Sequence, residues 1–113
     1  MSRPWRLWID DTRNPKNEVR YSGYGEDFKE EDFVWAQTRE QAEYYVEMWG
    51  LPSFMALDHD LGYDGTTMEF LHWLQQRFPN TAPPPYRCHT ANPLGKQNMI
   101  SFLESWKKSV EVD

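Results

Sequence analysis

Three short runs of this chain, two of them apolar and one mixed, end in acidic or histidine side chains. These side chains are Asp10 and Asp11 after the first run, Asp58, His59 and Asp60 after the second, and His89 after the third. Carboxylates bind hard divalent cations, and histidine gains or loses a proton near neutral pH. Two of the three histidines of the chain lie at such run ends. The residue types and their positions therefore predict a metal site, acid–base chemistry, or both.

The chemistry of Asp10, Asp11 and Asp58 fits one hard divalent cation. Mg²⁺ takes oxygen ligands, usually keeps several waters, and binds only one or two carboxylates directly. Without a cation, three neighbouring carboxylates repel one another, and at least one of them binds a proton more readily. We therefore expect these three residues to form a site for Mg²⁺ or Mn²⁺. The alternative is that they cap helices and solvate loops.

His59 and His89 are candidates for a general acid and a general base. We expect them to face a common cleft, where one would activate water and the other would protonate the leaving oxygen of a phosphodiester. Two alternatives stay open. The histidines could coordinate Zn, Mn or Fe together with Asp58 or Asp60, or each ring could bond a backbone carbonyl in a structural role. His72 lies in the middle of a predicted helix and is interpreted as structural.

The segment that opens the last predicted helix has the features of an anion site. Free N–H groups and the helix dipole attract phosphate to such a position. Asn92 can cap the helix, Gly95 permits close approach, and Lys96 adds a positive charge. Arg13 is a second candidate cationic contact. Beside His89, this segment is expected to bind the phosphate of a substrate, and the alternative is an ordinary helix start without a ligand.

Strands and helices must bring these run ends together. Short apolar runs predict buried strands over Arg6–Ile9, Phe33–Ala36 and Phe54–Leu57, and the mixed segment Tyr86–Thr90 is predicted to be a short fourth strand. Helical patterns follow the last three strands, with boundaries at Thr38 and Gly50, at Thr66 and Pro79, and at Asn92. Strands that alternate with helices predict a parallel sheet with right-handed crossovers, hence a small open three-layer α/β sandwich of about four strands. Ligands bind outside the carboxyl ends of such strands.

The whole chain, residues 1–113, is predicted to form a single domain. A chain of 113 residues is long enough for one core, and a 16% aromatic content supplies large side chains for it. Residues 12–32 show no sustained periodicity and predict a long loop. The alternatives for this segment are a lid, a disordered segment or a weak helix.

Composition and charge exclude several functional classes. The chain has 12 Lys+Arg against 18 Asp+Glu, a formal net charge of −6, so bulk binding to a DNA backbone is not expected. A single cysteine, Cys88, excludes an internal disulfide framework and an all-thiolate zinc site, and we do not expect it to be a nucleophile. No apolar run approaches ~18 residues, so we expect no membrane segment and a cytoplasmic location. The sequence does not indicate the oligomeric state.

Two sequence blocks together are specific, L-D-H-D-L-G at 57–62 and H-T-A-N-P-L-G at 89–95. With L-W-I-D-D-T-R-N-P at 7–15, they resemble the cyclic-phosphate processing receiver domains of bacteria and their phages, which have receiver or flavodoxin-like topology. The resemblance implies a phosphoesterase-type hydrolase that acts on a cyclic phosphate of a nucleotide or RNA end. The residues at matching positions are Asp10, Asp11, Arg13, Asp58, His59, Asp60, His89 and Asn92.

The chain also departs from ordinary receivers, which have a fifth strand that ends in a lysine. The last predicted helix follows the fourth strand with no clear fifth strand after it, so we expect a truncated receiver fold and no phosphorylation of Asp58. In the leading hypothesis, His59, His89, Asp58 and Asp60 are catalytic. The alternative is a non-catalytic receiver-like module that binds or sequesters a nucleotide or a protein partner.

Overall fold

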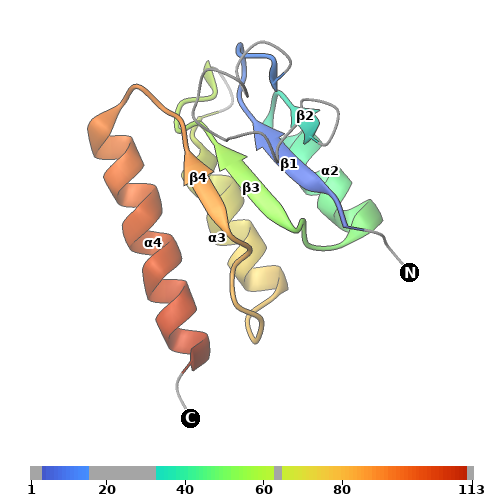
Figure 1. The fold of residues 1–113 in the computed structure, drawn as a ribbon, viewed down its shortest axis with the longest axis vertical. Coiled ribbons are helices and arrows are strands. Elements are labelled where there is room, and N and C mark those ends of the chain that lie inside the picture. The colour runs from blue at the N-terminus through green and yellow to red at the C-terminus, as the bar shows by residue number, and fades with distance from the viewer. Residues whose placement is uncertain (1–3, 16–32, 63–64, 112–113) are drawn as a thin grey trace.

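The computed structural model describes residues 4–15, 33–62 and 65–111 and contains the four predicted strands. The strands are β1 (Arg6–Ile9), β2 (Phe33–Ala36), β3 (Phe54–Leu57) and β4 (Tyr86–Cys88), and the helices are α2 (Arg39–Trp49), α3 (Thr67–Arg77) and α4 (Pro93–Glu111) (Figure 1). The predicted α/β receiver-like fold is therefore confirmed. One boundary differs, because β4 ends at Cys88 and leaves His89 and Thr90 beyond the strand.

The sheet is parallel throughout, and its strand order is β2-β1-β3-β4. The chain runs from β1 outward to β2 and then returns past β1 to β3, so the direction of winding reverses between β1 and β3. In open α/β sheets, ligands bind at the carboxyl ends of the strands beside such a reversal. The register places Ile9 opposite both Ala36 and Leu57, and Leu57 opposite Cys88. The first residues after β1, β3 and β4 therefore lie side by side.

All three described helices pack on one face of the sheet (Figure 1). Side chains alternate along a strand, so Leu7 and Ile9 of β1 face the helices together with Met55 and Leu57 of β3. The opposite face carries a second buried cluster of Trp8, Phe33 and Ala56. The structure thus describes two of the three predicted layers. The predicted loop over 12–32 lies outside the described residues from residue 16 onward.

The predicted helix boundaries are confirmed by their capping contacts. The amide of Gln41 donates to the Thr38 hydroxyl over 3.1 Å at the start of α2, and the capping box of Thr66 with Glu69 starts α3. Gly50 ends α2 with a φ of 83°, in the left-handed region that favours glycine. None of the helices in the described ranges is both long and apolar enough to cross a membrane.

Aromatic side chains fill the core, as the composition predicts. Trp8 and Trp106 are among the largest fully buried side chains. Each indole N–H still finds an acceptor, since Trp8 donates to the carbonyl of Arg13 over 2.8 Å and Trp106 donates to that of Thr81 over 2.9 Å. The buried tryptophans therefore add apolar area without leaving their N–H groups unpaired.

Candidate functional site

Backbone hydrogen bonds continue the sheet by one residue past its carboxyl edge. The amide of Asp10 donates to the carbonyl of Ala36 over 3.0 Å, and the amide of Asp58 donates to that of Ile9 over 3.0 Å. The amide of His89 donates to the carbonyl of Leu57 over 2.9 Å. These bonds hold Asp10, Asp58 and His89 in one row across three neighbouring strands. We call these three residues the strand-end row.

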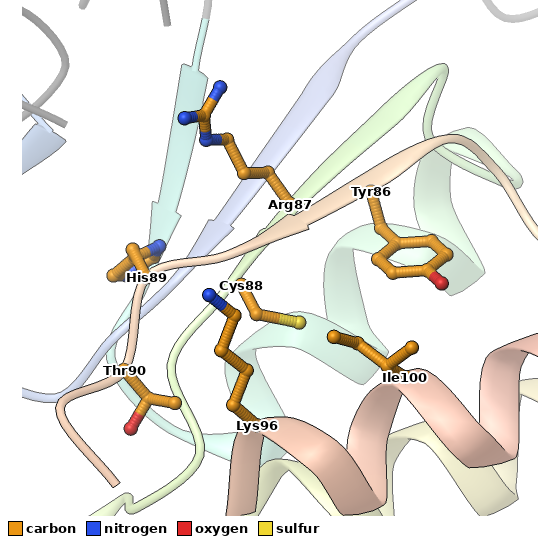
Figure 2. A pocket seen from close by; sticks show the side chains of 7 residues that line it. All are labelled: Tyr86, Arg87, Cys88, His89, Thr90, Lys96 and Ile100. Carbon is orange, nitrogen blue, oxygen red and sulfur yellow. The ribbon is translucent and has the colours of Figure 1, made fainter. Parts of the chain in front are cut away.

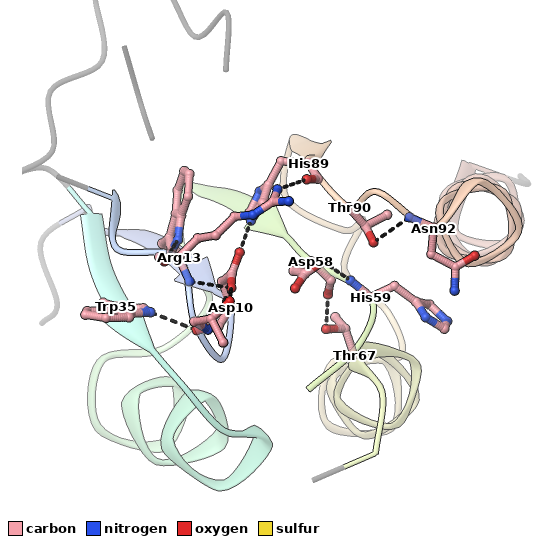
Figure 3. A network of polar contacts seen from close by, with 11 residues as sticks. Asp10, Arg13, Trp35, Asp58, His59, Thr67, His89, Thr90 and Asn92 are labelled. Atoms are coloured by element: carbon pink, nitrogen blue, oxygen red, sulfur yellow. Dashed lines mark hydrogen bonds and ion pairs between the residues drawn. The ribbon is translucent and has the colours of Figure 1, made fainter. Parts of the chain in front are cut away.

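Asp10 is fully buried and accepts hydrogen bonds on both carboxylate oxygens. Its Oδ1 accepts from the amides of Thr12 and Arg13 over 2.9 and 2.8 Å, and its Oδ2 lies 3.0 Å from Nε2 of His89 (Figure 3). Burial by itself would raise the pKa of Asp10, but the bonds from His89 and the two amides outweigh it and hold this pKa below its ordinary value. Asp10 is therefore a carboxylate at neutral pH.

Besides its bond to Asp10, His89 is held by one contact to its ring and one contact to its backbone. Its ring stacks on Trp8 with the ring centroids 4.3 Å apart and the planes 16° from parallel, and its side chain is only 5% exposed. Nη1 of Arg13 donates to the backbone carbonyl of His89 over 3.0 Å. Arg13 was predicted to bind substrate, and the structure places it beside His89, where it already supports the backbone that carries the imidazole.

Asp58 lies in the strand-end row between Asp10 and His89. Its Oδ1 accepts from the amide of His59 over 2.9 Å, and the Thr90 hydroxyl also bonds its side chain. The Thr67 hydroxyl donates to the backbone carbonyl of Asp58 and so connects the end of β3 to the start of α3 (Figure 3). Burial, followed by the negative charge of Asp10, raises the pKa of Asp58 above its ordinary value. The carboxylate of Asp58 is therefore short of compensating positive charge.

The structure brings together the three predicted metal ligands. One carboxylate oxygen from each of Asp10, Asp11 and Asp58 lies within 4.8 Å of the other two. Gly62 leaves space for this group, because a Cβ at Gly62 would lie 3.1 Å from Oδ2 of Asp11. Three converging carboxylates with a raised pKa at Asp58 fit a hard cation, which would relieve their repulsion.

His59 does not face a common cleft with His89, so that prediction is wrong. The ring of His59 points toward α4 (Figure 3). A Cβ at Gly95 of α4 would lie 2.6 Å from Nδ1 and 2.7 Å from Cδ2 of the ring, so His59 occupies the space that this glycine leaves. The physical reason is the alternation of side chains, because Asp58 points to the face opposite the helices and the next residue points back toward them.

Asp60 bonds His59, and Asn92 bonds Asp60, so these two residues lie beside His59 and not in the strand-end row. Nδ1 of His59 lies 3.0 Å from Oδ1 of Asp60, and this hydrogen bond lowers the pKa of the exposed Asp60 carboxyl. Nδ2 of Asn92 donates to Oδ2 of Asp60 over 3.4 Å, while Oδ1 of Asn92 accepts from the amide of Gly95 over 3.0 Å. Asn92 thus caps α4 as predicted, whereas the space beside Gly95, expected to admit a substrate phosphate, holds the ring of His59 instead.

Lys96, the remaining predicted substrate-binding residue, lies at a pocket beside the strand-end row. This pocket has a volume of about 460 Å³, and its described lining is Tyr86, Arg87, Cys88, His89, Thr90, Lys96 and Ile100 (Figure 2). Burial raises the pKa of the Cys88 thiol to about 11, which agrees with the prediction that it is not a nucleophile.

Sequence reasoning missed several residues that contact the strand-end row, among them Trp8, Thr67, Thr90 and Trp35, whose indole N–H donates to the carbonyl of Asp10 over 2.8 Å. Trp8 lies under His89, Thr90 bonds the Asp58 carboxylate, and Thr67 bonds the Asp58 carbonyl. Trp8 had a detectable signal, because it lies two residues before Asp10 and therefore on the same face of the sheet. The two threonine contacts depend on loop conformation, for which the sequence carries no periodic signal.

Comparison with known proteins agrees with the architecture. The family model described as cyclic-phosphate processing receiver domain matches residues 5–105. A solved fusion protein described as a yeast Spc42 trimeric coiled coil, amino acids 181–211, matches with a TM-score of 0.59 and 16% identity. The match covers 98% of this chain and 83% of that one, and it shows a shared fold. No curated protein matches the sequence.

Proposed function

This chain belongs to the family of cyclic-phosphate processing receiver domains, and on that premise we propose that it hydrolyses a cyclic phosphate on a nucleotide or an RNA end. The observation that carries the proposal is the buried pair of Asp10 and His89, 3.0 Å apart, with Asp58 as their neighbour in the strand-end row. A carboxylate that orients a histidine at the carboxyl edge of a parallel sheet is suited to proton transfer.

His89 is the proposed acid–base residue. Because Asp10 is ionised, it accepts the hydrogen of His89 Nε2 and orients the ring, and the proposed proton exchange with substrate is assigned to Nδ1. In the proposed reaction, water attacks phosphorus while His89 accepts one proton from it, and a P–O bond of the ring breaks. His89 then returns this proton to the leaving sugar oxygen. The product is a phosphate monoester with a free hydroxyl group.

Asp11 and Asp58 are the proposed direct ligands of Mg²⁺ or Mn²⁺. Asp10 already accepts hydrogen bonds from Thr12, Arg13 and His89, so it has the least capacity left for a metal. A bound divalent cation would polarise the phosphoryl oxygens and lower the pKa of a bound water. Within this chain, Arg13 lies next to His89 and is proposed to contact the phosphate.

A second candidate function is binding of a nucleotide without turnover. The position of His59 favours it, because only one of the two predicted acid–base histidines belongs to the strand-end row. Hydrolysis by a single histidine requires that His89 both accept and donate the proton. A binding module makes no such demand.

Multiple-turnover assays distinguish the two functions. Cyclic mononucleotides and short RNAs that end in a 2′,3′-cyclic phosphate would be incubated with the protein, with and without Mg²⁺ or Mn²⁺. We expect product from the wild-type protein and from the control variant His72→Gln, which changes an exposed histidine of α3. The variant His89→Gln should form little product while remaining folded. Tight binding of these ligands without product would support the binding module instead.

A further inference from the structure

Asp11 is the proposed metal ligand whose direction depends most on the backbone. Hydrogen bonds from His59 and Thr90 hold the carboxylate of Asp58. The partly buried carboxylate of Asp11 accepts no hydrogen bond from the residues that the structure describes. One of its oxygens nevertheless lies within 4.8 Å of an oxygen of Asp10 and of Asp58. The backbone on either side of Asp11 must therefore direct this side chain.

The peptide groups on both sides of Asp11 are anchored. The carbonyl of Asp10, which belongs to the peptide group before Asp11, accepts from Nε1 of Trp35 over 2.8 Å (Figure 3). The amide of Thr12, which belongs to the peptide group after it, donates to Oδ1 of Asp10 over 2.9 Å. Each peptide group is planar, so these two bonds restrict the backbone torsions of Asp11 and with them the direction of its Cα–Cβ bond.

The Trp35 bond occupies an acceptor that the sheet leaves open. The amide of Asp10 donates to the carbonyl of Ala36 over 3.0 Å. The next bond of this parallel ladder would run from the amide of Thr38 to the carbonyl of Asp10. Among the described residues this bond is not formed, because the chain turns into α2 at Thr38, which caps that helix. The indole N–H of Trp35 donates to the carbonyl in its place.

Packing limits how far the indole of Trp35 can move. The register pairs Trp35 with Trp8, so both side chains lie on the face of the sheet opposite the helices. Trp35 packs there against the buried cluster of Trp8, Phe33 and Ala56. A donor on a packed ring is pre-organised, and groups outside the ligand shell commonly orient metal ligands in this way.

We propose that Trp35 is a positioning residue for the divalent cation. Its indole N–H holds the peptide group that links Asp10 to Asp11, and the Asp11 carboxylate is thereby directed toward that of Asp58. The inference rests on the metal site of the proposed function. In this role Trp35 touches neither the cation nor the substrate, so removal of its N–H should weaken cation binding without removing a ligand atom.

The experiment measures Mn²⁺ binding to protein freed of metal with EDTA, from the electron paramagnetic resonance signal of unbound Mn²⁺. Trp35→Phe removes the N–H and keeps an aromatic ring. We expect its dissociation constant for Mn²⁺ to rise about tenfold, the lower end of the usual range for groups outside the ligand shell. An Mn²⁺ affinity equal to that of the wild-type protein would overturn the proposal.

Trp5→Phe is the matched control. The indole N–H of Trp5 also donates to a backbone carbonyl, that of Gly50 over 3.1 Å, but it lies at the opposite end of β1. This variant should leave the Mn²⁺ affinity unchanged, and thermal unfolding shows that each variant is folded. If Trp35→Phe does not fold, 3-benzothienylalanine at position 35 repeats the test, because sulfur then replaces only the N–H of the ring.

A double-mutant cycle tests whether Trp35 acts through Asp11. Asp11→Asn replaces the charged ligand and should itself weaken Mn²⁺ binding. In that background Trp35→Phe should add little further loss, because no Asp11 carboxylate is left to direct. A purely structural effect of Trp35→Phe would weaken binding equally in both backgrounds, and losses that multiply in this way would overturn the proposal.

Three results separate this inference from the proposed hydrolysis. If the wild-type protein binds Mn²⁺ and forms product, and Trp35→Phe binds Mn²⁺ equally well, the positioning role is wrong and the proposed function stands. If Mn²⁺ affinity depends on Trp35 through Asp11 but no product forms, the positioning role is supported and hydrolysis is not. A wild-type protein that binds no Mn²⁺ would overturn the metal site and this inference together, whatever its turnover.

Discussion

Replacing Asp58 with asparagine should stabilise the protein when no divalent cation is present. Oxygens of Asp10, Asp11 and Asp58 lie within 4.8 Å of one another. At 4.8 Å and an effective dielectric constant of about 20, two carboxylates repel by roughly 3.5 kcal/mol. Hydrogen bonds from His59 and Thr90 and the partial exposure of Asp58 offset part of this repulsion. We expect a net gain of about 1–2 kcal/mol, which corresponds to a rise of about 4–8 °C in Tm.

The gain from Asp58→Asn should depend on pH with a definite sign. The pKa of Asp58 is raised in the folded protein by burial and by the charge of Asp10, so its carboxylate destabilises the fold at neutral pH. As the pH falls through this raised pKa, the wild-type Asp58 becomes protonated and the repulsion disappears. The difference in Tm between variant and wild type should therefore be largest near pH 7 and should shrink as the solution becomes acidic.

Thermal unfolding in EDTA and in Mg²⁺ tests this reasoning. Asp60→Asn is the matched control, because hydrogen bonding to His59 lowers the pKa of Asp60 and its loss should not stabilise the fold. In Mg²⁺ the wild-type protein should gain stability and Asp58→Asn should gain little. An Asp58→Asn protein that melts at or below the wild-type Tm in EDTA at pH 7 would refute the proposed repulsion. An equal Mg²⁺ effect on both proteins would refute the metal site.

Three further predictions concern the two histidines. His89→Gln should lower kcat about 10²–10⁴-fold in steady-state assays, and wild-type turnover in this variant would exclude His89 as the acid–base group. Gly95→Ala should cost about 1–3 kcal/mol in denaturant unfolding, because the new Cβ overlaps the ring of His59. His59→Ala in the same protein should recover most of that loss, and a neutral single variant would contradict the packing. Trp8→Leu removes the ring under His89 and should lower the free energy of unfolding by about 2–4 kcal/mol. It should also lower kcat, and an unchanged kcat would show that the stack does not position the histidine.

The strand-end row was predictable because few rules determine it. Short apolar runs separated by capped helices imply parallel strands, and parallel strands bring their carboxyl ends to one edge. Asp10 and Asp58 directly follow their apolar runs, and His89 lies near the end of the fourth predicted strand, so the register of the sheet places the three residues side by side. The metal grouping follows from the same geometry, since Asp11 is next to Asp10.

The orientation of His59 was predicted wrongly because the prediction rested on which strand ends share one edge of the sheet, and not on which face each side chain points to. Leu57 faces the helices, so Asp58 faces away from them and His59 turns back toward α4. The alternation of side chains was present in the sequence and would have separated the two histidines. The Thr90 hydroxyl is a different case, because its bond to Asp58 depends on the turn that follows β4.

Among the described residues, His59 lies on the face of the sheet that packs against the helices, and the strand-end row lies on the face where we place the chemistry. The helices cover the face to which His59 belongs, and that histidine fills the space above Gly95 and joins the start of α4 to the end of β3. Asp10, Asp58 and His89 turn to the other face, where Trp8 supports the imidazole. Substitution of His59 should therefore be detected first in unfolding, and substitution of His89 first in binding or turnover. His59→Gln and His89→Gln form the most direct pair for this distinction, because they make the same chemical change at the ends of two neighbouring strands.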